Sequence, residues 1–145
     1  MIAEIFQQEV ADILGLEKST PVPLEQERQV YATAFGLYEA GDYRAAALLF
    51  TQLVLTNPYS EYYWQGLASS KQMAHEYHAA LHAWGLCALL DENNPLPHFH
   101  AAECCLSLDD KEEALKALSA ALERCRDDAM REKITLLKTI HYAKS

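Results

Sequence analysis

The sequence lacks features that mark several classes of protein. It has no run of about 18 apolar residues, so we expect no membrane-spanning helix. Its first residues have neither the basic start nor the continuous apolar run of a secretory signal peptide, and we therefore expect a cytosolic protein. It also lacks a glycine-rich phosphate loop and a Gly-x-Ser-x-Gly motif. We expect a protein that is not an enzyme and needs no cofactor.

Basic residues are in the minority. The chain has 12 Lys and Arg against 21 Asp and Glu, which gives a net charge of -9. An acidic chain with dispersed basic residues is poorly suited to bind nucleic acid or an anionic membrane surface. This balance favours a partner that is apolar or basic.

Cysteine is scarce, and the four residues Cys87, Cys104, Cys105 and Cys125 are expected to be thiols. Neighbouring cysteines on one helix point in different directions and are poor disulfide partners. Most of the four fall on helix faces that are expected to pack.

Three histidines, His75, His78 and His82, have a spacing that could bring imidazoles together on a helix. No cysteine lies at metal-ligand spacing from them, and a closed set of four ligands is missing. We therefore expect no metal site. A metal-dependent regulator or enzyme remains a rival hypothesis that metal analysis of the purified protein would decide.

The residues that favour strands are also sparse, whereas Ala and Leu dominate, so the fold class is all-α. The first predicted helix is amphipathic and is separated from the others by prolines at positions 21 and 23. The expected helices span residues 2–14, 24–40, 43–56, 60–74, 77–90, 97–108, 111–124 and 128–143.

A sequence repeat organises the predicted helices. The small residues Ala46, Ala80 and Ala114 are equally spaced, and the large residues at positions 50, 84 and 118 follow the same spacing. A helix, a tight turn and a second helix within about 34 residues is the tetratricopeptide period. We predict three tetratricopeptide-like repeats (27–60, 61–94 and 95–128) in a right-handed superhelix. Residues 1–23 form an N-terminal helix and linker, the repeat region spans 24–128, and 129–145 form a C-terminal capping helix.

The first helix of each repeat contributes side chains to a concave face that the core does not need. Tyr31, Phe35 and Tyr38 form a stripe at i, i+4 and i+7 on this face, and Tyr62 and Phe99 extend it. Clustered aromatic rings in a concavity are typical anchor sites for a protein partner, each contributing about 2 kcal/mol. The alternative is that these rings pack against the N-terminal helix or its linker.

Three stretches resemble a known family, the class II chaperones of translocator proteins in bacterial type III secretion. They are Phe99-His-Ala-Ala-Glu-Cys104, the run from Tyr31 to Tyr43, and the run from Trp64 to Gln72, and the likeness covers about residues 24–125. The resemblance implies a chaperone of the bacterial cytoplasm whose groove holds an extended segment of a translocator. It also implies a homodimer formed with the N-terminal helix.

The residues predicted to bind a partner and to form the dimer follow from the concave positions and from this resemblance. The predicted groove residues are Tyr31, Phe35, Tyr38, Tyr43, Tyr62, Gln65, Ser69, Gln72, Phe99, Glu103 and Leu106. The predicted dimerisation residues are Ile2, Ile5, Phe6, Val10, Ile13 and Leu14.

Such a groove would keep the apolar segments of a translocator soluble and competent for export, because buried apolar residues cannot aggregate. The alternative function is a general tetratricopeptide adaptor or assembly scaffold. An adaptor that captures a C-terminal carboxylate needs a basic clamp, and Arg28 is alone among the predicted concave positions in being basic.

Overall fold

The computed structural model describes residues 22–142. A 3-10 turn, η1 (Leu24–Gln26), leads into the α-helices, and the described part of the chain contains no strand. The α-helices are α2 (Glu27–Glu39), α3 (Tyr43–Thr56), α4 (Glu61–Met73), α5 (Tyr77–Leu90), α6 (Pro95–Ser107), α7 (Lys111–Arg124) and α8 (Asp128–Tyr142). The all-α prediction is confirmed. The predicted helix over 2–14, with all six predicted dimerisation residues, lies outside the described residues.

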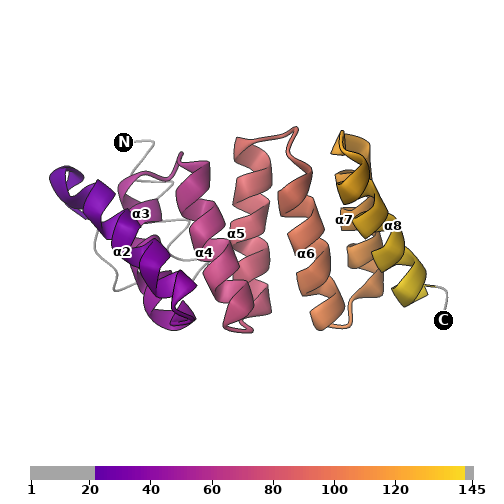
Figure 1. Cartoon of the computed structure of the whole chain (residues 1–145), viewed down its shortest axis with the longest axis horizontal. Coiled ribbons are helices and arrows are strands. Elements are labelled where there is room, and N and C mark those ends of the chain that lie inside the picture. The colour runs from indigo at the N-terminus through magenta and orange to yellow at the C-terminus, as the bar shows by residue number, and fades with distance from the viewer. Residues whose placement is uncertain (1–21, 143–145) are drawn as a thin grey trace.

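The helices follow one another in chain order along the long axis of the molecule, from α2 at one end to α8 at the other (Figure 1). Each helix packs mainly against the helices that precede and follow it in the sequence. Two successive helices form one repeat, as the spacing of the small and large residues predicts. Among the described residues, no helix has the length and apolarity needed to cross a membrane.

The same turn joins the two helices of each repeat. Gly41, His75 and Asp109, which occupy the same position in the three repeats, have positive φ angles of 86°, 63° and 59°. In the first turn the amide of Asp42 donates to the carbonyl of Leu37 at 2.9 Å, and the equivalent bonds in the other two turns measure 2.9 and 2.8 Å. This is the Schellman arrangement, in which a left-handed residue closes a helix end. The backbone of the three turns is therefore equivalent although their side chains differ.

The core lies between the helices and combines large rings with alanines. Trp64 and Trp84 are almost fully buried, and the indole of Trp64 donates to the carbonyl of Pro58 at 2.7 Å. Alanine at the repeat positions 46, 80 and 114 is fully buried, which allows neighbouring helices to approach closely. Ile134 of α8 is fully buried and belongs to the cluster that α6 and α7 form, so α8 covers the end of the last repeat.

Most helix boundaries lie within one residue of the predictions, and the larger differences are at the starts of two helices. The first helix of the array begins as the 3-10 turn rather than as α-helix. Helix α6 begins at Pro95, two residues earlier than predicted, because the side chain of Asn94 accepts a hydrogen bond from the amide of Leu96 and caps the helix. Proline fits the first helical position because the N–H that it lacks would have no partner within the helix there.

All four cysteines are free thiols, and all four are buried, whereas the sequence placed only three of them on packing faces. Burial raises the pKa of Cys87 and of Cys104 to about 12, and the nearby carboxylates of Glu61 and Glu103 act in the same direction. These thiols are part of the core packing and stay protonated at neutral pH.

Candidate peptide-binding groove

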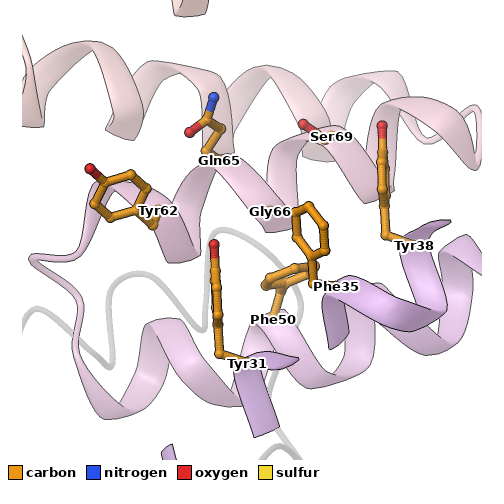
Figure 2. Close-up of a pocket in the computed structure, with 8 residues that line it drawn as sticks. All are labelled: Tyr31, Phe35, Tyr38, Phe50, Tyr62, Gln65, Gly66 and Ser69. Atoms are coloured by element: carbon orange, nitrogen blue, oxygen red, sulfur yellow. The ribbon is translucent and has the colours of Figure 1, made fainter. Parts of the chain in front are cut away.

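An aromatic pocket lies between α2 and α4. Its volume is about 310 Å³, and its lining residues are Tyr31, Phe35, Tyr38, Phe50, Tyr62, Gln65, Gly66 and Ser69. Figure 2 shows the Tyr31 and Tyr38 rings extending from α2 toward α4, with Phe35 between them and Phe50 beneath. The structure therefore brings together every predicted groove residue of the first two repeats except Tyr43 and Gln72.

Tyr31 lies at the centre of the aromatic contacts. Its ring centroid is 6.4 Å from that of Phe35, 6.0 Å from that of Phe50 and 5.4 Å from that of Tyr63. Edge-on and tilted ring pairs at such distances stabilise one another beyond the area that they bury. Phe35 remains 47% exposed and Tyr62 63% exposed, so the pocket offers apolar ring surface that the fold leaves uncovered.

Two residues of the pocket were not predicted, Phe50 and Gly66. Phe50 is 1% exposed and forms the floor, so the same ring belongs to the core and to the pocket. A Cβ atom on Gly66 would lie 2.5 Å or less from three atoms of the Phe50 ring. A glycine in a helix interior is destabilising, so its presence usually has a packing reason. The glycine at position 66 was therefore the signal in the sequence that a side chain approaches the backbone of α4 closely.

A second, open hollow continues the groove toward the start of the array. It has a volume of about 630 Å³ and shares Tyr31 and Tyr62 with the aromatic pocket. The hydroxyl of Tyr63 donates to Glu27 Oε1 at 2.6 Å in its wall, which ties α4 to α2. Burial, reinforced by this carboxylate, raises the pKa of Tyr63 above its usual value, so the hydroxyl stays protonated and keeps donating.

A polar network occupies the concave face beyond the aromatic pocket. The indole Nε1–H of Trp84 donates to Gln72 Oε1 at 2.9 Å, and Gln72 Nε2 donates to Glu103 Oε1 at 3.2 Å. His100 Nδ1 lies 2.6 Å from the same carboxylate oxygen, and the His100 ring stacks on Trp84 with centroids 4.7 Å apart. The predicted groove residues Gln72 and Glu103 are thus bonded to each other, and they connect the second repeat to the third.

The carboxyl group of Glu103 is held in its charged form. Burial would raise its pKa, but the hydrogen bonds from His100 and Gln72, together with the positive charge of Lys133 on α8, lower the pKa below its usual value. The concave face therefore carries a fixed negative charge at neutral pH.

Besides Gln72 and Glu103, three predicted groove residues lie outside the aromatic pocket. Tyr43 packs its ring edge-on against Tyr38, with centroids 5.3 Å apart. Phe99 is half-buried against the cluster of α6, α7 and α8, and its ring meets the edge of His100. Leu106 is half-buried on α6. Within the described residues these three do not form a continuous wall with the pocket.

The histidines proposed as a rival metal site do not converge. His75 Nδ1 is 2.6 Å from the hydroxyl of Tyr77, and His78 and His82 are exposed on α5. In the part of the chain that the structure describes, no three His, Cys, Asp or Glu side chains are placed to hold a metal ion.

The chain is similar to proteins of type III secretion. No protein-family model matches it. The low calcium response locus protein H of Yersinia pestis is 33% identical over 99 residues, which are 68% of this chain and 59% of that protein. The chain thus matches less than two thirds of the length of protein H.

Solved structures match the fold as well as the sequence. PcrH from Pseudomonas aeruginosa is 30% identical, with a TM-score of 0.68 over 80% of this chain and 96% of that one. The Yersinia enterocolitica type III secretion chaperone SycD, in complex with a peptide of the translocator YopD, is 29% identical, with a TM-score of 0.69 over 80% and 97%.

These similarities cover most of the chain. They confirm the predicted tetratricopeptide-like fold and the prediction that the chain is not an enzyme, because SycD is a chaperone. The chain belongs to the family of tetratricopeptide-repeat chaperones that serve type III secretion translocators.

Proposed function

We propose that this chain is a chaperone of the bacterial cytoplasm that binds an extended, apolar segment of a type III secretion translocator in its groove. The observation that carries the proposal is the aromatic pocket between α2 and α4, where ring surface is exposed in a hollow. The complex of SycD with a translocator peptide supports it, since that chaperone shares this fold.

The dimensions of the groove suit an extended segment. A pocket of about 310 Å³ is at the lower end of the range for ligand sites, which is about 300–1,000 Å³, so it has room for a few side chains and not for a folded surface. The second hollow shares two tyrosines with it, so a chain lying across both would set successive apolar residues against ring surface.

Binding of this kind explains how a chaperone of this size could work. A segment that inserts into membranes aggregates when its apolar residues meet water or one another. Aromatic rings that cover those residues remove the cause of aggregation while the segment remains unfolded and ready for export.

A general adaptor is the weaker candidate. Among the described residues that line the two hollows, Arg28 is the only basic one. Recognition of a free carboxylate usually needs more than one such donor.

We also propose that the helix predicted over 2–14 forms a homodimer. Sedimentation of a chain without residues 1–15 tests this, because the mass of the assembly should fall from that of a dimer to that of a monomer.

The groove is tested by replacing Tyr31 and Tyr38 with alanine together. The variant should lose co-purification with co-expressed translocators, because two rings of the pocket wall are gone. The matched control replaces Leu48 and Leu89, which are 65% and 71% exposed outside the pocket, and should retain the partner. Unchanged binding by the tyrosine variant, with its helicity intact, would overturn the proposed site.

A further inference from the structure

The concave face next to the aromatic pocket carries one fixed carboxylate, that of Glu103. Ser69 lines the pocket, and Gln72 lies one helical turn further along α4, where it donates to Glu103 Oε1. Residues three apart on a helix are neighbours, so the carboxylate lies roughly 10 Å from the pocket. The side chain of Glu103 is 38% exposed and can be reached from the groove.

The network around this carboxylate fixes its position. The indole of Trp84 holds Gln72 Oε1, which leaves the amide NH₂ of Gln72 directed at Glu103. His100 is held by stacking on the same indole while its Nδ1 contacts the carboxylate. A group whose partners are themselves held loses little freedom when a ligand binds, so it is preorganised for recognition.

The ion-pair partner of Glu103 is His100, which is charged only when protonated. Two hydrogen bonds converge on Oε1, and within the described residues Oε2 has none. The groups that face the carboxylate are His100 on its own helix, Gln72 from α4 and Lys133 from α8. Among the described ion pairs, Glu103 has no Lys or Arg within 4.0 Å.

We propose that Glu103 is the subsite for a basic side chain of the bound segment, so that the groove selects a Lys or Arg about three residues from an apolar anchor. This inference rests on the proposed function of the groove. About three residues of extended chain span the roughly 10 Å between pocket and carboxylate. A cation placed there completes the hydrogen bonding of Oε2 and forms a charge-assisted pair.

The test uses the full chain and synthetic decapeptides with leucine or proline at alternate positions. A single Lys, Gln or Glu is placed in turn at each remaining position, and affinity is measured by fluorescence polarisation at low and high salt. At one position Lys should bind about tenfold more tightly than Gln, and this preference should weaken with salt.

The variant Glu103→Gln should abolish the preference for Lys, so that Lys and Gln peptides bind it with equal affinity. Glutamine keeps an oxygen that accepts from His100 and Gln72, so the network is retained. The control Glu123→Gln removes the same charge from a site on α7 where the side chain is 78% exposed, and it should keep the preference.

Other outcomes separate this inference from the function on which it rests. A Lys preference that survives in Glu103→Gln, or that is absent while binding still depends on Tyr31 and Tyr38, would overturn the subsite and leave the groove. Equal weakening of all peptides together with a lower melting temperature would make Glu103 a purely structural residue and also overturn it. Peptides that bind the tyrosine double variant as well as the native chain would refute the groove, and the subsite with it.

Discussion

The replacement Gly66→Ala tests whether the floor of the pocket is as tightly packed as the structure shows. The added Cβ would lie 2.5 Å or less from three atoms of the Phe50 ring, whereas carbon atoms in good contact are about 3.5–4.0 Å apart. Phe50 is 1% exposed and packs edge-on against Tyr31, so its ring cannot move away from the added Cβ without disturbing that packing.

The expected magnitude is the difference of two effects. Overpacking of this kind costs about 1–3 kcal/mol, while alanine is more favourable than glycine in a helix by about 1 kcal/mol. Because the added atom meets a ring and not a flexible side-chain end, we expect the cost of overpacking to lie in the upper part of its range. The free energy of unfolding should fall by about 1–2 kcal/mol, which lowers the melting temperature by roughly 3–8 °C.

Thermal and urea unfolding followed by circular dichroism would measure this change. The control is Gly85→Ala on α5, where an added Cβ meets nothing within 4 Å and should raise stability by about 0.5–1 kcal/mol. In a chain that already carries Phe50→Leu, the cost of Gly66→Ala should largely disappear, because the ring atoms it would meet are gone. If Gly66→Ala stabilises the chain as much as Gly85→Ala does, the close packing of Phe50 on α4 is wrong.

Two further predictions concern the turns and the thiols. Asp109→Gly should stabilise the chain by about 0.5–1 kcal/mol in thermal unfolding, because a left-handed backbone strains residues with a side chain. Gly41→Ala at the equivalent turn should destabilise the chain for the same reason. If Asp109→Gly destabilised the chain and Gly41→Ala stabilised it, the turn assignment would be contradicted. Cys87 and Cys104, with pKa values raised to about 12, should resist iodoacetamide at pH 8 in the native protein and react in urea. The free energy of unfolding should fall above pH 9, because the thiols of the unfolded chain lose their protons at lower pH than those of the folded chain. Rapid native alkylation of either thiol would refute its burial.

The repeat spacing made most of the fold predictable. Helices α3, α5 and α7 begin and end at the predicted residues, because turn signals and buried alanines recur at the same spacing around each of them. The start of α6 was missed because the Asn94 cap places Pro95 inside the helix, where a proline normally indicates a loop.

The candidate site was predictable only where helix periodicity determines it. The stripe of Tyr31, Phe35 and Tyr38 follows from the phase of one helix, and the structure places all three at the pocket. The pairing of Gln72 with Glu103 depends on the distance between α4 and α6, which no spacing within one helix reveals. Position 50 was predicted only as a large residue of the repeat, although a ring at the edge of a core can also face a cavity.

The double role of Phe50 divides the pocket into a part that can vary and a part that cannot. The floor is core, so a substitution there changes the stability of the fold whatever it does to recognition. The rim is different, because Tyr62 and Gln65 are exposed and hold little of the structure together. Related chaperones with other partners should therefore differ first at these two rim positions of α4, while the ring beneath them and the glycine that admits it stay as they are.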